Sequence, residues 1–176
     1  MLSGEVTRLR ARYDSDIPVL HANLYDDVET RVRADSRPWY PIPPGSGSPY
    51  RVPGPDDRTA CFSVVLLANS ELAGEALLWD IDLHNRTAHI GISLIPEFRG
   101  RGLGSDVVRV LCRYGFAIRG LHRLQAETLA DNVAMIAAAG RAGFRREGTL
   151  RRSAWVNGDF ADEVIFGLLA TEWEDS

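Results

Sequence analysis

The sequence contains no lysine, so all 20 basic side chains among its 176 residues are arginine. The codon bias of a GC-rich genome explains this absence, and an arginine rather than a lysine at one position therefore carries almost no functional information. Acidic residues outnumber the arginines, giving a formal net charge of -4. This charge balance does not indicate a broad nucleic-acid-binding surface, although it is compatible with a local basic patch.

Cysteine, histidine and long hydrophobic runs are also scarce. Cys61 and Cys112 form no CxxC motif, and the four histidines show no metal-ligand spacing. We therefore predict reduced thiols and no metal site. No apolar run is long enough to span a bilayer, and no basic segment followed by an apolar core opens the sequence. These absences predict a cytoplasmic protein without a membrane span or a signal peptide.

The residues that are present predict one globular α+β domain over 1–176, with 45% hydrophobic and 25% charged residues. Periodicity predicts a strand, two helices, three strands, a helix, a strand, a helix and two strands. The predicted strands are 5–12, 61–68, 72–81, 88–95, 123–129, 144–155 and 160–169, and the predicted helices are 14–26, 27–34, 104–119 and 132–142. Because a strand–helix–strand crossover lies among hairpins, the sheet is predicted to be mixed.

The same patterns predict local roles for two aspartates. Asp131 has the side chain of a good N-cap for the helix that follows it. Asp106 is predicted to face water, because Val107, Val108 and Leu111 define the apolar face of its helix.

Residues 36–58 hold most of the prolines and cannot form a helix or a central strand. This segment is either a plain surface loop or a loop that covers a substrate. Its aromatic residues Trp39, Tyr40 and Tyr50, together with Trp155, could contact a cationic amine through their ring faces.

The glycine-rich turn at 99–104 is the most informative segment. It joins the end of a predicted strand to the start of a helix, and this arrangement leaves backbone N–H groups free to receive a phosphate or pyrophosphate. Large side chains at Gly102 or Gly104 would obstruct that approach. A glycine-rich turn without a ligand is the simpler interpretation. A dinucleotide site is disfavoured because Gly100, Gly102 and Gly104 form GxGxG rather than GxGxxG.

The segment Arg99-Gly100-Arg101-Gly102-Leu103-Gly104 resembles the pyrophosphate loop, [RQ]xxGx[GA], of the GNAT superfamily of N-acetyltransferases. Asn132 followed by Gly143-Phe144 is similar to the second signature of that family. The strand before the loop and the hairpin around Asn157-Gly158 resemble the RimJ/RimL-like branch, which acetylates protein N-terminal amines, and spermidine acetyltransferases. The resemblance covers essentially the whole chain. It implies a mostly antiparallel, twisted sheet of about seven strands, splayed between the fourth and fifth, with about four flanking helices.

The resemblance also implies that acetyl-CoA is the cosubstrate, that an amine-bearing molecule is the acceptor, and that the protein forms a homodimer. The pantetheine arm would pair with the strand backbone, and the pyrophosphate would bind the glycine loop. The implied cofactor-binding residues are Ile92, Leu94, Ile95, Arg99, Gly100, Arg101, Gly102, Leu103, Gly104, Ser105 and Asn132. The backbone N–H near Leu94 would polarise the thioester carbonyl.

His89 and Glu75 are the candidate general bases that remove a proton from the acceptor amine. His89 stands where many RimJ/RimL-like relatives have glutamate, and a histidine accepts a proton near neutral pH. Glu127 is a weaker candidate base, and Ser153 a weak candidate donor to the leaving thiolate. Relatives often carry a tyrosine general acid where this sequence has Ala139, so the general acid stays unassigned.

Two functions remain open at this point. The first is an acetyl-CoA-dependent N-acetyltransferase that acts on a protein N-terminus, a small amine or a polyamine by direct attack in a ternary complex. The alternative is a non-catalytic acetyl-CoA-binding sensor or interaction module, which the departures at His89 and Ala139 favour.

Overall fold

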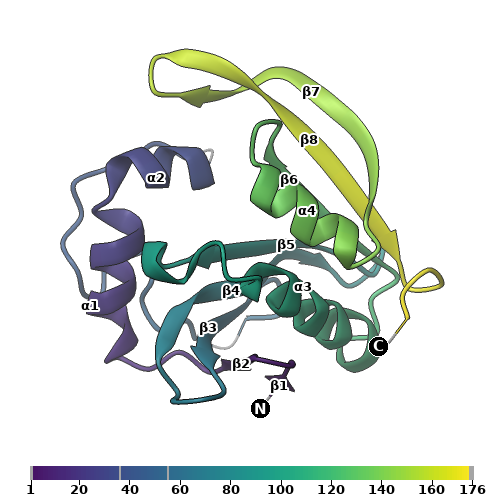
Figure 1. Ribbon diagram of the computed structural model, residues 1–176, viewed down its shortest axis with the longest axis horizontal. Coiled ribbons are helices and arrows are strands. Elements are labelled where there is room, and N and C mark those ends of the chain that lie inside the picture. The colour runs from purple at the N-terminus through teal and green to yellow at the C-terminus, as the bar shows by residue number, and fades with distance from the viewer. Residues whose placement is uncertain (1, 36, 55, 175–176) are drawn as a thin grey trace.

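The computed structural model describes residues 2–35, 37–54 and 56–174, and its centre is one eight-stranded sheet (Figure 1). The strand order is β1-β2-β3-β4-β5-β6-β8-β7, and every neighbouring pair is antiparallel except β5–β6. The strands are β1 (Leu2–Ser3), β2 (Thr7–Arg10), β3 (Ala60–Leu66), β4 (Leu72–Asp82), β5 (Thr87–Leu94), β6 (Arg123–Leu129), β7 (Arg145–Val156) and β8 (Asp159–Leu169). The predicted mixed sheet is confirmed, and the additional strand is the two-residue β1.

The parallel pair β5–β6 is joined over only three residue pairs, which end at His89 and Gln125. Beyond this point β5 continues to Leu94 and β6 to Leu129 without pairing to each other. The predicted splay between the fourth and fifth predicted strands is therefore confirmed, and it opens toward the carboxyl ends of both strands.

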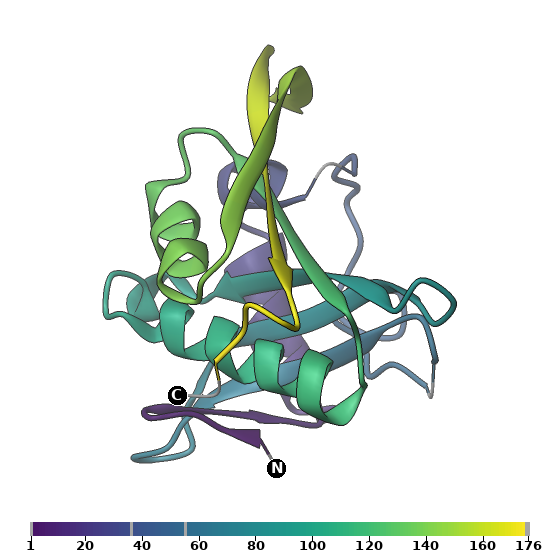
Figure 2. The same cartoon turned by 90° about the vertical axis from the view of Figure 1, so that its right-hand side faces the viewer.

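Helices cover both faces of the sheet. They are α1 (Asp16–Leu20), which continues into the π-helix η1 (His21–Tyr25), α2 (Val28–Ala34), α3 (Leu103–Arg113), which continues into the π-helix η3 (Tyr114–Ile118), and α4 (Val133–Arg141). A 3₁₀ turn, η2 (Pro96–Phe98), follows β5. The helices α3 and α4 pack together, whereas the β7–β8 hairpin extends from the body as a two-stranded arm (Figures 1 and 2).

Alternating residues of β2 show which helices face each side of the sheet. Thr7 contacts Asp106 of α3, whereas Arg10 binds Asp16 of α1 from the opposite face. Asp16 is 4% exposed and also accepts a hydrogen bond from the Ser63 hydroxyl of β3. A buried aspartate thus joins α1 to the face of the sheet that lies opposite α3.

Asp106 corrects the sequence-based prediction, because it is 3% exposed rather than solvated. Its carboxylate accepts hydrogen bonds from the backbone N–H groups of Glu5, Val6 and Thr7 and from the Thr7 hydroxyl, at 2.7–3.1 Å. Helical periodicity could not predict this, because the donors come from the turn between β1 and β2 at the other end of the sequence.

The N-cap of α4 is also corrected. The cap is Asn132 rather than Asp131, and its side-chain oxygen accepts a hydrogen bond from the Met135 N–H at 3.2 Å. Asp131 instead forms an ion pair with Arg33 of α2 at 2.7 Å. Both residue types cap helices well, so composition could not decide between neighbouring positions.

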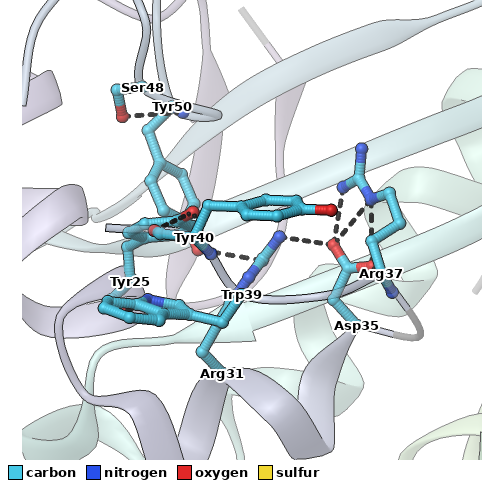
Figure 3. A network of polar contacts seen from close by, with 8 residues as sticks. All are labelled: Tyr25, Arg31, Asp35, Arg37, Trp39, Tyr40, Ser48 and Tyr50. Carbon is cyan, nitrogen blue, oxygen red and sulfur yellow. Dashed lines mark hydrogen bonds and ion pairs between the residues drawn. The ribbon is translucent and has the colours of Figure 1, made fainter. Parts of the chain in front are cut away.

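The proline-rich segment between α2 and β3 contains no helix or strand in its described residues, as predicted. It is nevertheless fixed to η1 and α2 (Figure 3). The Tyr25 hydroxyl donates to the Tyr40 carbonyl at 2.8 Å, and the Trp39 indole donates to the Tyr25 carbonyl at 3.1 Å. Tyr50 is 1% exposed, so it belongs to the core and does not line an open surface.

Across the described ranges, no helix is long and apolar enough to cross a membrane. The same ranges contain no group of three His, Cys, Asp or Glu side chains arranged to hold a metal ion.

Candidate functional site

The glycine loop forms an open cradle at the start of α3. Gly100 and Gly102 have φ values of +73° and +80°, a left-handed conformation that glycine adopts without strain. A Cβ atom at either position would meet no atom within 4 Å, so the space beside the loop is open. Gly102 is the N-cap of α3 and provides no side-chain cap, which leaves the first N–H groups of the helix for water or a ligand.

Gly104 lies beside the neighbouring helix α4. A Cβ atom there would lie 3.8 Å from the Cβ of Ala138, which is an ordinary van der Waals contact. The predicted place of Gly104 in the phosphate-binding loop stays a prediction.

Three arginines surround the cradle. The Arg99 side chain donates to the Leu94 carbonyl at 2.8 Å, and the Arg101 guanidinium lies 5.4 Å from the centre of the Phe98 ring. Arg141, from the last turn of α4, donates to the Ser105 hydroxyl at 3.3 Å. Together with the N-terminus of α3, these cations form a site suited to a pyrophosphate.

Arg141 was not predicted from the sequence. Its only sequence signal is a basic residue directly before Ala142 and the Gly143-Phe144 motif. The packing of α4 on α3 then brings it to the loop.

The unpaired part of β5 connects this cradle to the interior of the splay. Ile92 and Leu94 are half-buried on the α3 side of the strand, and Ile95 is 3% exposed. Because β6 diverges after Gln125, the edge of β5 toward β6 has no strand partner beyond His89. An extended arm containing amide groups can pair with such an edge.

Asn132 lies on the α4 side of the splay, and both ends of its side-chain amide have protein partners. The oxygen caps α4, and the nitrogen donates to the Thr128 hydroxyl at 2.8 Å. Its predicted contact with the cofactor stays a prediction.

Glu75 of β4 lies on the face opposite α3 and is held by Arg12. The Glu75 carboxylate and the Arg12 guanidinium are 2.7 Å apart, and their side chains are 12% and 1% exposed. Burial raises the pKa of the Glu75 carboxyl, and the Arg12 cation opposes this shift. A carboxylate that neutralises a fully buried arginine is poorly suited to give up its charge during a reaction.

A polar network surrounds this pair. Asp35 at the end of α2 binds Arg31 and Arg37 from two sides (Figure 3). The Arg31 side chain also reaches the Tyr50 hydroxyl at 3.4 Å. The pKa of Asp35 is lowered because hydrogen bonds from Arg37 and the charges of both arginines outweigh its burial.

His89 lies where β5 and β6 part. Its ring stacks on Trp79 of β4, with centroids 4.2 Å apart. Its Nδ1 atom is 3.6 Å from the Glu127 Oε1 of β6, and the two side chains are 22% and 30% exposed. Cross-strand pairs place Glu75 and His89 on the same face of the sheet, although only His89 is beside β6.

Ser153 lies on the exposed β7–β8 arm, where its hydroxyl donates to the Glu163 carboxylate at 2.8 Å. Trp155 is on the same arm, 62% exposed, and packs edge-on against Phe160. Ala139, at the position of the family tyrosine, is fully buried in α4. The structure therefore shows no hydroxyl at the position where the family pattern would provide the general acid.

Residues 7–145 match the acetyltransferase (GNAT) domain family. A putative ribosomal N-acetyltransferase of Bacillus subtilis is 36% identical over 109 residues, which are 62% of this chain and 60% of that protein. A spermidine N(1)-acetyltransferase of Escherichia coli is 28% identical over 100 residues, 57% of this chain and 54% of that protein. The match thus spans little more than half the length of these curated relatives.

Two solved structures share the fold. The spermidine N-acetyltransferase of Vibrio cholerae, in complex with CoA and spermine, has a TM-score of 0.79 at 20% identity and covers 94% of this chain and 96% of its own. Mycobacterium smegmatis RimJ, in complex with CoA-disulfide, has a TM-score of 0.75 at 20% identity and covers 94% and 83%. The splayed sheet, the glycine cradle and the match over residues 7–145 agree, and the chain belongs to the GNAT acetyltransferase family.

Proposed function

We propose that this protein transfers an acetyl group from acetyl-CoA to a primary amine by direct attack in a ternary complex. The observation that carries the proposal is the arrangement of the splay and the cradle: the unpaired edge of β5 leads directly to the open, arginine-lined start of α3. Bound acetyl-CoA supplies an activated thioester carbonyl. The chain's own residues hold the two substrates, orient them and accept a proton.

The cradle and the β5 edge fit the two halves of the cosubstrate. Backbone N–H groups at residues 100–105, with Arg99, Arg101 and Arg141, would bind the pyrophosphate. The β5 backbone near Leu94 would pair with the pantetheine arm and polarise the carbonyl.

His89 is favoured over Glu75 as the general base. Glu75 is committed to Arg12, whereas His89 has a buried Nδ1 without a hydrogen-bond partner and lies at the base of the splay. An amine with a pKa near 10 is mainly protonated at neutral pH, so a neutral imidazole beside it would assist its deprotonation.

For the acceptor, the proposal names a class of amines rather than a single compound. The relatives named for ribosomal and spermidine acetylation support a protein N-terminus, as in the RimJ/RimL-like branch, or a small amine or polyamine. The homodimer and the cytoplasmic location stay predictions.

A non-catalytic acetyl-CoA sensor is the second candidate. It is favoured by the buried Ala139, which leaves no hydroxyl at the position of the family tyrosine. Binding of acetyl-CoA without turnover on any amine would support this candidate.

The first test is thiol release. Purified protein, acetyl-CoA and a panel of peptides with free N-termini, polyamines and small amines should release CoA thiol in an amine-dependent manner, detected with a thiol-reactive dye. Mass spectrometry should show the acetylated amine. Silence across the panel, together with measurable acetyl-CoA binding by calorimetry, would contradict the enzyme and favour the sensor.

The second test places a negative charge at the cradle. Ser105→Glu should weaken acetyl-CoA binding by about 10- to 100-fold, because the carboxylate repels the pyrophosphate and competes for Arg141. The fold should be preserved, since an acidic side chain in the first turn of a helix is favourable. Calorimetry measures the affinity and thermal unfolding measures stability. Ser105→Ala is the matched control, and equal affinity of both variants would mean that the pyrophosphate binds elsewhere.

A further inference from the structure

Beside His89, polar side chains on one sheet face follow one another from β6 to β7. The Gln125 amide donates to the Glu127 Oε1 at 2.6 Å, and Arg123 donates to the Gln125 side-chain oxygen at 3.2 Å. Arg123 also forms an ion pair with Glu147 of β7. Glu127 is therefore held in place from its own strand, and the charge of Arg123 is balanced by a carboxylate other than Glu127.

The other side of His89 is covered by an aromatic ring. Trp79 stacks on the imidazole from β4, at an interplanar angle of 33°. On the β6 side, Glu127 approaches the ring directly, whereas Arg123 and Glu147 form their own ion pair beyond Gln125. Glu127 is therefore the carboxylate that faces the His89 ring.

The two nitrogens of His89 are consequently unequal. Nδ1 is buried and lacks a hydrogen-bond partner, and the acceptor recorded opposite it is the Glu127 Oε1 at 3.6 Å. This separation is longer than a hydrogen bond, and closing it requires a movement of the His89 or Glu127 side chain. A carboxylate opposite Nδ1 favours the tautomer with its proton on Nδ1, which leaves the lone pair on Nε2.

We propose that Glu127 is a positioning residue, which holds the His89 Nδ1–H so that Nε2 accepts a proton from the acceptor ammonium. This inference rests on the proposed acetyl transfer and assigns to Glu127 a role that acts through His89. Trp79 fixes the ring plane, and Gln125 fixes the carboxylate. The arrangement follows the general rule that a third group orients a catalytic base.

The proton balance of the step is complete without a further reactant. The ammonium gives one proton to Nε2, and the freed nitrogen forms the amide bond as the thioester C–S bond breaks. The second proton of the nitrogen goes to the coenzyme sulfur, which leaves as a thiol. His89 then releases its proton to water, and Glu127 forms and breaks no covalent bond in the step.

The decisive variant is Glu127→Gln, which preserves size and removes the charge. NMR measurement of the imidazole nitrogen shifts, with the His89 signals assigned from a His89→Gln sample, should show a smaller fraction of the Nδ1-protonated tautomer in the variant than in the wild type. The value of kcat/KM should fall about 10-fold because the ring is no longer oriented. The KM for acetyl-CoA should not change.

Two controls keep the test specific. Glu127→Asp retains the charge and should restore part of the lost activity and of the Nδ1-protonated tautomer. Glu5→Gln makes the same chemical change on the exposed turn against α3, where the side chain pairs with Arg109, and should leave both readouts unchanged. Thermal unfolding of each variant confirms that it is folded.

The outcomes separate this inference from the proposed function. Turnover in the wild type with no change of the His89 tautomer in Glu127→Gln would overturn the positioning role alone. A changed tautomer in a protein that acetylates no amine would overturn the proposed function, and the role of Glu127 in the reaction with it.

Discussion

Replacing Glu75 with alanine is expected to lower the free energy of unfolding by about 3–5 kcal/mol, which is the usual effect of removing one partner of a buried ion pair. Arg12 is the reason. Its side chain is 1% exposed, its Nε atom is buried without a hydrogen-bond partner, and Glu75 provides its only ion pair in the described residues. Without the carboxylate, a full positive charge would remain buried. Urea denaturation followed by circular dichroism measures the change.

Two further replacements separate the effect of the lost charge on stability from the effect of the lost side-chain volume. Glu75→Gln preserves the volume and should lose most of the same stability, because the amide cannot neutralise Arg12. Arg12→Met combined with Glu75→Leu should be less destabilised than either single variant, since neither residue leaves a buried charge behind. A double-mutant cycle reports the coupling.

The same variants test the choice between the two candidate bases. If Glu75 were the base, Glu75→Gln would keep its unfolding midpoint and lose acetyl transfer. We expect the reverse order of effects: the variant loses stability, and its folded fraction should retain acetyl transfer. A stable but inactive Glu75→Gln would contradict this assignment.

The sequence was sufficient for features whose parts are neighbours along the chain. Gly100, Gly102 and the start of α3 are adjacent, so the glycine pattern predicted both the turn and the helix end. The hairpin at Asn157-Gly158 is likewise local, and both residues have the positive φ that its turn requires. The order of strands and helices followed from periodicity and was confirmed.

The features that were missed depend on residues far apart in sequence. Asp106 has the spacing of a solvent-facing helical residue, and nothing near it indicates that a turn about a hundred positions earlier supplies its donors. In the sequence, Asn132 and Asp131 are equally good candidates for the N-cap of α4. Only the packing of α2, which places Arg33 beside Asp131, distinguishes them.

The residues of the candidate site likewise fall into those that are neighbours in the sequence and those that only folding brings together. The cofactor loop is contiguous, so its residues could be named together. Arg141 and Glu127 reach Ser105 and His89 only through the packing of α4 on α3 and the pairing of β6 with β5. The sequence alone did not show that Arg12 neutralises Glu75, because a paired and an unpaired glutamate at this position look the same in the sequence.

The second large effect is expected at Asp106. Replacing it with alanine should lower the free energy of unfolding by about 2–4 kcal/mol, because buried donors lose a charged acceptor. The carboxylate binds three consecutive N–H groups and the Thr7 hydroxyl, and no other acceptor is recorded for these donors of the β1–β2 turn. Hydrogen exchange at residues 5–7 should accelerate more than elsewhere, since this turn joins the edge of the sheet to α3.

Asp106→Asn is the matched control for charge. It retains one side-chain oxygen, but it turns an N–H₂ group toward donors, so it should be destabilised nearly as much as the alanine variant. A variant with wild-type exchange at residues 5–7 would show that the turn is held by other contacts.

The pH dependence of this effect has a defined sign. Hydrogen bonds from Thr7, Glu5 and Val6 outweigh the burial of Asp106 and lower its pKa below the usual 3.8. A folded-state pKa below the unfolded value means that the stabilisation is present above the unfolded value and is lost as the pH falls through the folded one. The difference in unfolding temperature between the wild type and Asp106→Asn should therefore be constant near neutral pH and shrink below about pH 4. A difference that already shrinks between pH 7 and pH 5 would mean that Asp106 is protonated more easily than its four donors allow.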